Sequence, residues 1–384
     1  MRNIAYFDNA ATTFPKPEIV YRFMDKFYRE CGVNVGRGQH KLATKAAKLI
    51  SDTRASLIEL LHCKNKKVIF THTATEALNI VLQGINLNSG DTVYISPFEH
   101  NAVTRVLYHL QKKTCIHVEQ LTVERETIQF NLDEIKNQFE IKKPAAVIVS
   151  HASNVCGVVA PIQEICALAK QYQAITVIDM CQTAGLIDTD LSTNNIDFAV
   201  FAGHKTLYGP FGVAGFICSP TVELSPLLFG GTGIDSANQE LPETIPERFE
   251  VASPNIHAIS GLYAALQWIK EVGIDEIYRK EQANHRRLLD LLKKYRNIGV
   301  VSSNKSNEIG IVSCVFEGYS SDVIGNVLSE KDIAVRTGLH CAPFAHRFLR
   351  TFPTGTVRFS VGYFNTEEDF VRLEKALDYI AENA

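Results

Sequence analysis

The chain has 384 residues, of which 46% are hydrophobic, and this is enough for two lobes with sizeable cores. A formal net charge of −3 excludes a general attraction to nucleic acid or to an anionic membrane surface. Nine cysteines without C-x-x-C spacing argue against a disulfide framework or a ribbon-type zinc site, and no apolar run approaches the length of a membrane span, so we expect a protein of the reducing cytoplasm.

The first elements in chain order are an arm and two helices. Two prolines and several small side chains predict an extended arm over residues 1–17. A helix is expected at about 18–29 and a long amphipathic helix at about 45–61. The glycine-spaced loop between them, 34–40, carries His40. Either this is a plain surface loop or it contributes to a binding site.

From residue 68 onward the pattern alternates strands and helices. Apolar strands are predicted at about 68–71, 92–96, 145–150, 174–180 and 197–202. This alternation predicts an α/β fold with a mostly parallel sheet. Polar side chains follow the strands in turn: Thr75, His100, Asn154, Asp179 with Gln182, and His204 with Lys205. Because ligands of such sheets bind outside the carboxyl ends of the strands, we expect these groups to converge at one edge.

Lys205 is the centre of this prediction. It follows an apolar strand and Gly203, and a single lysine in that position usually extends to solvent. Asp179, at the end of the preceding predicted strand, changes the interpretation. A lysine that forms a Schiff base and an aspartate that holds a pyridinium nitrogen are the pair that pyridoxal phosphate requires. Thr75, in the first turn of a helix, is either a phosphate ligand or a simple N-cap.

The pattern changes near residue 258. Helices at about 258–272 and 275–295, strands at 310–316 and 333–336, and a last helix at 367–381 predict a smaller α+β lobe. We therefore expect an arm over 1–17, a large cofactor-binding domain over 18–257 and a small domain over 258–384.

Two side chains of the small lobe are candidates for chemistry. Cys341 is expected in a loop, unlike Cys314, which is expected in an apolar strand, so Cys341 is the candidate nucleophile. A zinc site of His340, Cys341 and His346 is disfavoured, because adjacent ligands give poor tetrahedral geometry and no fourth ligand is offered. Arg358, in an alternating strand, forms either a surface salt bridge or a bidentate clamp on a substrate carboxylate.

These segments together resemble the class V branch of the pyridoxal-phosphate-dependent aminotransferase fold (fold type I), and within it the cysteine desulfurase and selenocysteine lyase family. The resemblance spans nearly the whole chain and rests on these motifs: DNAATT (8–13), ATEALN (74–79), EH (99–100), HASN (151–154), DMCQ (179–182), GHK (203–205), GGTG (230–233), RFE (248–250), SPN (253–255), RTGLHC (336–341) and RFSVGYFNT (358–366).

The resemblance implies roles for individual residues. Lys205 would bind the cofactor as a Schiff base, Asp179 would pair with its ring nitrogen, and His100 would stack on its ring. The other implied cofactor ligands are Asn154 and Gln182 at the ring, Ala74, Thr75 and His204 at the phosphate, and Thr232 at the phosphate of a partner subunit's cofactor. The implied substrate ligands are Arg358, Arg336, Asn154, His40 and Ala11, with Cys341 as the sulfur-accepting nucleophile.

The implied function is that of a homodimeric cysteine desulfurase, a sulfurtransferase that converts L-cysteine to L-alanine and leaves a persulfide on Cys341 for a protein sulfur acceptor. Neither nucleic acid nor a membrane is an expected partner. Two departures from the family pattern keep alternatives open: Ala202 stands where a phosphate-binding hydroxyl is common, and the loop after Lys205 is one residue longer. The alternatives are a selenocysteine lyase or another C–S lyase, and a weakly active cofactor-binding scaffold in sulfur trafficking.

Overall fold

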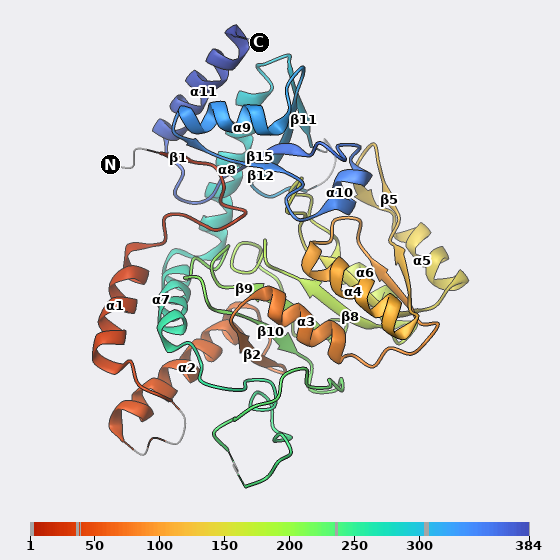
Figure 1. Cartoon of the computed structure of the whole chain (residues 1–384), viewed down its shortest axis with the longest axis vertical. Helices are drawn as coiled ribbons and strands as arrows, with labels where there is room; N and C mark the ends of the chain where they lie inside the picture. Colours follow the sequence, from red (N-terminus) through yellow and green to blue (C-terminus); the bar gives the residue numbers. More distant parts are fainter. Residues whose placement is uncertain (1–3, 36–37, 39, 235–236, 303–306, 384) are drawn as a thin grey trace.

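The computed structural model describes residues 4–35, 38, 40–234, 237–302 and 307–383, so part of the loop at 34–40 lies outside the described residues. The chain forms a large lobe around a seven-stranded sheet and a smaller lobe around a four-stranded sheet (Figure 1). Among the described residues, no helix is both long and apolar enough to cross a membrane.

The large sheet is mostly parallel, which confirms the predicted fold class. Its strands, in spatial order, are β2 (Lys67–Thr71), β10 (Ala214–Cys218), β9 (Phe198–Ala202), β8 (Ile175–Asp179), β7 (Pro144–Ser150), β3 (Thr92–Ile95) and β4 (His117–Gln120). Only β10 runs antiparallel to its neighbours. The carboxyl ends of β2, β9, β8, β7 and β3 therefore meet at one edge.

Helices bury both faces of this sheet, which explains the unbroken apolar runs of its strands. In β9, Phe198 and Val200 belong to the core beneath α3 (Ala74–Gly84) and α4 (Asn101–Thr114). Ala199 and Phe201 face the opposite core, which also contains residues from the following helices: α1 (Glu18–Cys31), α2 (Lys41–Leu60), α5 (Leu132–Ile141), α6 (Ile162–Lys170) and α7 (Ile256–Val272).

The small lobe is built on an antiparallel sheet with the order β11 (Ile298–Val301), β12 (Ile311–Phe316), β15 (Thr356–Ser360) and β14 (Arg336–Gly338). The helices α8 (Ile274–Leu292), α9 (Ser321–Glu330) and α11 (Glu367–Glu382) pack around it (Figure 1). The short strand β1 (Ala5–Tyr6) pairs with β13 (Ile333–Ala334), so the N-terminal arm is tied to this lobe.

A short helix and a hairpin lie at the junction of the lobes. The helix α10 (Pro343–Phe348) follows Cys341 directly, and the hairpin of β5 (Val123–Glu124) and β6 (Gln129–Phe130) lies beside it in Figure 1. Phe98, three residues after β3, joins the two, because its ring lies 6.1 Å from that of Phe130 and 5.4 Å from that of Phe348.

The position of α7 bears on the domain boundary. Its apolar residues share a core with α1 and α2, on the large-lobe side of the molecule. The next helix, α8, contributes Ile277 to that core and Leu288, about three turns later, to the small-lobe core. We therefore propose a boundary at Gly273, between α7 and α8, in place of the one expected after residue 257.

Candidate functional site

A cavity of about 300 Å³ lies at the carboxyl edge of the large sheet, between the lobes. That volume is at the lower end of the range for small-molecule sites. The sequence-predicted residues that line it are Ala11, Ala74, Thr75, His100, Asn154, Asp179, Gln182, His204, Lys205, Arg336 and Arg358. The predicted convergence of polar groups at one sheet edge is therefore present in the structure.

The N-terminus of α3 opens into this cavity. Thr73 caps the helix, because its hydroxyl accepts a hydrogen bond from the Glu76 N–H at 3.1 Å. Thr75 is therefore not the N-cap. Together with Ala74 it forms the first turn, where backbone N–H groups have no partner within the helix and the helix dipole favours an anion. Ala202 also lines the cavity and offers no hydroxyl.

The N-terminal arm fixes the backbone of the Lys205 loop. The Thr12 hydroxyl donates to the His204 carbonyl at 2.9 Å, and the Thr13 hydroxyl donates to the Lys205 carbonyl at 2.8 Å. Gly203 leaves room for β10, since a Cβ atom there would lie 2.6 Å from the Val213 carbonyl oxygen. The Lys205 side chain is half-buried in the cavity.

Asp179 and His100 face the same cavity from neighbouring strand ends. Asp179 is 8% exposed, and its Oδ1 accepts the Cys181 N–H at 2.9 Å. His100 caps α4 by accepting the Ala102 N–H at Nδ1, 3.0 Å away. Burial, followed by the positive charge of Lys205, lowers the pKa of His100 to about 4. The imidazole is therefore neutral at pH 7 and carries its proton on Nε2.

His204 presents a buried nitrogen without a partner among the described residues. Its ring stacks on Phe211 at a centroid distance of 4.4 Å, and its Nδ1 makes no hydrogen bond. Burial, with the charges of Lys205 and Lys16, lowers the pKa of His204 to about 3. A buried polar atom without a partner is costly, so this nitrogen is available to a ligand.

Arg358 is the most buried charged group of the site, at 1% exposure, which rules out the surface salt bridge considered from sequence. Its Nη2 donates to Oδ1 of Asp8 at 2.8 Å, and its Nη1 donates to the Asn154 carbonyl at 3.0 Å. Its Nε is buried without a partner among the described residues. Burial lowers the pKa of Arg358, and the negative charge of Asp8 opposes this change. The guanidinium therefore keeps donors for a carboxylate that enters the cavity.

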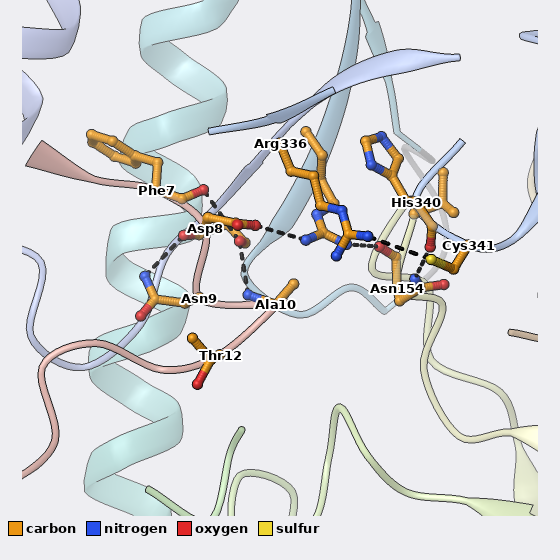
Figure 2. A network of polar contacts seen from close by, with 12 residues as sticks. Phe7, Asp8, Asn9, Ala10, Thr12, Asn154, Arg336, His340 and Cys341 are labelled. Atoms are coloured by element: carbon orange, nitrogen blue, oxygen red, sulfur yellow. Dashed lines mark hydrogen bonds and ion pairs between the residues drawn. The ribbon is translucent and has the colours of Figure 1, made fainter. Parts of the chain in front are cut away.

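Cys341 lies beside the cavity, outside the set of residues that line it, and is half-buried. Its thiol is 3.4 Å from Nη2 of Arg336 (Figure 2). Its carbonyl accepts the Asn101 N–H at 2.7 Å. The carbonyl of His340 accepts Nδ2 of Asn154 at 2.7 Å. Two of these contacts, to Asn101 and Asn154, join this small-lobe loop to the edge of the large lobe.

The loop is also strained. Gly338 has φ +91°, and the non-glycine residues His340 and Cys341 have φ of 46° and 58°. Glycine adopts a positive φ without steric cost, whereas for His340 and Cys341 the conformation costs of order 1 kcal/mol each, and such residues gather at functional sites. Cys314, by contrast, is fully buried in β12, and burial raises the pKa of its thiol well above the ordinary value. The structure thus separates the candidate nucleophile from this core cysteine.

His40 and Thr232 do not join the Lys205 cavity. Both line a second, larger cavity of about 890 Å³ between α2 and the segment 228–255. His40 caps α2 through Nδ1, which accepts the Ala43 N–H at 3.2 Å. Neither residue serves the Lys205 site of its own chain in this arrangement, so their predicted roles require a second subunit.

The histidines near Cys341 have other partners than a metal. His340 Nε2 lies 2.8 Å from the Thr356 hydroxyl, and His346 Nδ1 lies 2.7 Å from the Thr351 hydroxyl. In the part of the chain that the structure describes, no group of three or more histidine, cysteine or acidic side chains is arranged to hold a metal ion.

Comparison with known proteins gives a consistent result. The sequence model of the class V aminotransferases matches residues 5–373. A probable cysteine desulfurase of Pyrococcus abyssi is 31% identical over 376 residues, which cover 96% of this chain and 92% of that protein. The chain belongs to the class V aminotransferase family.

Two solved structures show that the similarity extends from the sequence of this chain to its fold. The apo structure of the cysteine desulfurase from Thermococcus onnurineus has a TM-score of 0.90 and 28% identity, and the match covers 99% of this chain and 95% of that one. The cysteine desulfurase CsdA of Escherichia coli has a TM-score of 0.88 and 26% identity, with coverage of 99% and 95%. The fold class predicted from sequence is thereby confirmed.

Class V aminotransferases use pyridoxal phosphate, and the residues of this cavity fit that group. The first turn of α3 and the free Nδ1 of His204 suit a phosphate. Asp179 suits a protonated ring nitrogen, and the amine of Lys205 suits covalent attachment. The neutral ring of His100 suits stacking on the pyridine.

Sequence reasoning missed two side chains that support the site. Asp8 pairs with Arg358, although it stood inside a quoted motif. Glu99 is fully buried and accepts the Ser150 N–H at 2.6 Å and the Ser150 hydroxyl at 2.9 Å, which joins the ends of β3 and β7. Burial raises the pKa of Glu99 to about 7. The signal in the sequence that could have identified Glu99 was its position next to His100.

Proposed function

We propose that this class V aminotransferase is a cysteine desulfurase, which transfers sulfur from L-cysteine to Cys341 and releases L-alanine. The observation that carries the proposal is the position of the Cys341 thiol, held by Arg336 at the edge of a cavity that contains Lys205 and Asp179. The P. abyssi, T. onnurineus and E. coli relatives support it.

The residues of the chain divide the reaction between them. Pyridoxal phosphate, when bound, supplies an electron sink for the bond at the substrate α-carbon. Asp179 holds a proton on the ring nitrogen and so strengthens that sink. Arg358 binds the substrate carboxylate. Lys205 would hold the cofactor through Nζ, and the same atom, when free, would accept the α-proton of the substrate.

Cys341 then acts as the nucleophile through its thiolate. Its Sγ attacks the sulfur of the substrate, so that a sulfur–sulfur bond forms while the bond between the substrate Cβ and its sulfur breaks. The electron pair of the broken bond stays with the carbon skeleton, which takes up protons to become alanine. No external oxidant or reductant is required, because the carbon gains the electrons that the sulfur loses.

The enzyme is proposed to act as a homodimer in which the second cavity of one chain completes the Lys205 cavity of the other. Two observations support this. Thr232 and His40 line the same cavity. Phe211 and Phe229, which are adjacent in sequence to residues that line this cavity, are 65% and 75% exposed and are thus available to a second subunit. The nine cysteines are all free thiols, which supports the proposed cytoplasmic location.

The test of the proposed function is a product balance. Purified protein loaded with pyridoxal phosphate is given L-cysteine and dithiothreitol, and alanine, sulfide and pyruvate are quantified together. A desulfurase yields alanine and sulfide in equal amounts. Pyruvate with sulfide indicates the C–S lyase alternative, and the absence of products indicates the scaffold alternative.

A further inference from the structure

A group of exposed side chains lies next to Cys341, on α10, on the residues after it, and on the facing hairpin. We call it the arginine surface: Arg125, Arg347, Arg350 and Phe352. Arg125 belongs to the tip of the β5–β6 hairpin, and its guanidinium lies 5.7 Å from the ring centre of Phe348 on α10. The hairpin and α10 therefore contribute to a single surface, at the right of Figure 1.

The arginine surface adjoins Cys341 along the chain. The helix α10 begins two residues after Cys341 and contains Arg347, six residues after it. A charged partner bound on this surface therefore lies next to the loop that carries the thiol.

Among the residues that the structure describes, the arginines of this surface have no carboxylate partner. Several exposed arginines elsewhere on the molecule pair with acidic side chains, as Arg29 does with Asp25 at 2.9 Å and Arg279 with Glu276 at 2.7 Å. Within the described ranges, no ion pair involves Arg125, Arg347 or Arg350.

The neighbouring charges leave the region positive. Glu124 and Glu126 flank Arg125 on the hairpin, and the Thr127 hydroxyl donates to Glu124. Arg105, exposed on the second turn of α4, and Arg336, beside the Cys341 thiol, add positive charge on the other side. The arginines outnumber the glutamates, although the chain as a whole has a net charge of −3.

The surface also has the composition of a protein interface. The Arg347 guanidinium lies 4.8 Å from the ring centre of Phe352 and 5.9 Å from that of Phe344. Phe352 is 42% exposed. Arginine and aromatic side chains are enriched in protein–protein interfaces, and stacking on rings holds the guanidinium in place while its N–H donors remain free.

We propose that the arginine surface docks an acidic segment of the protein that receives sulfur from Cys341. This inference rests on the proposed function, because it requires a persulfide on Cys341. The acceptor brings a cysteine thiolate, which attacks the outer sulfur of the persulfide. A new sulfur–sulfur bond forms on the acceptor, the old one breaks, and its electron pair returns to Cys341 as a thiolate, without net oxidation.

A protein is favoured over a nucleic acid because the occupant must supply a thiol, and because the positive charge is confined to this region. Such charge complementarity raises the association rate, typically tenfold or more, and fixes the orientation of the partner.

The experiment uses the full-length holoenzyme and two synthetic peptides of equal length, each with one central cysteine. In one peptide the cysteine is flanked by glutamates, and in the other each glutamate is replaced by glutamine. The initial rate of persulfide transfer from enzyme charged with L-cysteine is measured by mass spectrometry at low salt and at about 0.2 M salt. Three enzymes are compared: wild type, the double variant Arg347→Glu with Arg350→Glu, and the control Arg296→Glu, which reverses an exposed arginine that also lacks an ion pair in the described residues.

We expect the wild type and the control to transfer sulfur to the glutamate peptide about tenfold faster than to the glutamine peptide at low salt, and this preference to shrink with salt. The double variant is expected to lose the preference while it releases sulfide to dithiothreitol at the wild-type rate. Equal rates for the two peptides with wild type would overturn the proposal, as would a preference retained by the double variant. Stronger competition by an oligonucleotide than by an acidic peptide without cysteine would overturn the assignment to a protein. If no enzyme forms alanine from L-cysteine with dithiothreitol, it is the proposed function that fails.

Discussion

Asp8→Asn tests the buried ion pair that holds Arg358. The substitution keeps the shape of the side chain and an oxygen acceptor but removes the charge. Arg358 is 1% exposed, and the remaining partner of its guanidinium is the Asn154 carbonyl. Loss of one partner from a fully buried pair costs about 3–5 kcal/mol, because the other charge stays buried. Since the Asp8 side chain is 21% exposed, we expect about 2–3 kcal/mol here.

The matched control is Glu368→Gln, which removes the charge from an ion pair at the surface. Glu368 lies 2.6 Å from Arg372, and its side chain is 67% exposed. An exposed pair at this helical spacing contributes about 0.5 kcal/mol or less. The free energy of unfolding of each variant is obtained from its urea midpoint with one common m-value. Asp8→Asn should lose several-fold more of this free energy than Glu368→Gln.

A kinetic effect should accompany this loss of stability. Arg358 is expected to bind the substrate carboxylate, and without Asp8 its guanidinium is held less firmly, so KM for L-cysteine should rise about tenfold, a change of about 1.4 kcal/mol. Equal unfolding midpoints for Asp8→Asn and Glu368→Gln would refute the reasoning, since the buried pair would then contribute no more than a surface pair.

Three further predictions concern the cofactor, the dimer and pH. Lys205→Ala should abolish the visible absorbance and the borohydride-reducible adduct of the cofactor; a persistent adduct, detected by mass spectrometry, would show that another amine binds it. Co-expressed Lys205→Ala and Thr232→Ala chains, each poorly active alone, should regain activity as mixed dimers, because one site of each mixed dimer has both side chains; no regain contradicts the shared site. Burial lowers the pKa of His151 to about 4, so the folded protein binds fewer protons than the unfolded chain between pH 6.5 and 4, and stability falls as pH falls through that window. Between pH 7 and pH 5 the free energy of unfolding of the wild type should fall by about 2 kcal/mol more than that of His151→Gln, as measured by urea unfolding. Equal decreases would show that the pKa of His151 is not lowered by burial.

Periodicity and strand-end residues predicted most of the large lobe. The strands of the sheet are buried on both faces and therefore appear as apolar runs, and the residues after them converge because parallel strands end at one edge. The predicted helix near residue 76 is present, but its cap is Thr73 rather than Thr75. Two threonines so close together are equivalent in sequence, and only the backbone conformation distinguishes them.

Other features depend on contacts between distant residues and could not be derived from local pattern. The alternating pattern of the strand around Arg358 does not show which of its faces points to solvent. The carboxylate that compensates the burial of Arg358 belongs to Asp8 in the N-terminal arm, 350 residues away in the sequence. The packing of α7 on α1 likewise appears only when the chain has closed on itself. For His40, sequence gave no means of assigning the residue to one chain's cavity or to its partner's.

The most direct test of the desulfurase mechanism is the fate of L-cysteine in Cys341→Ser. The variant keeps Lys205, Asp179 and the cavity, so it should bind pyridoxal phosphate and show the spectral change on addition of L-cysteine. It lacks the nucleophile, so it should form no protein persulfide and almost no alanine, while selenocysteine, with its weaker bond to carbon, remains a partial substrate. If alanine forms from L-cysteine at a rate comparable to wild type, Cys341 is not the sulfur acceptor and the account is contradicted.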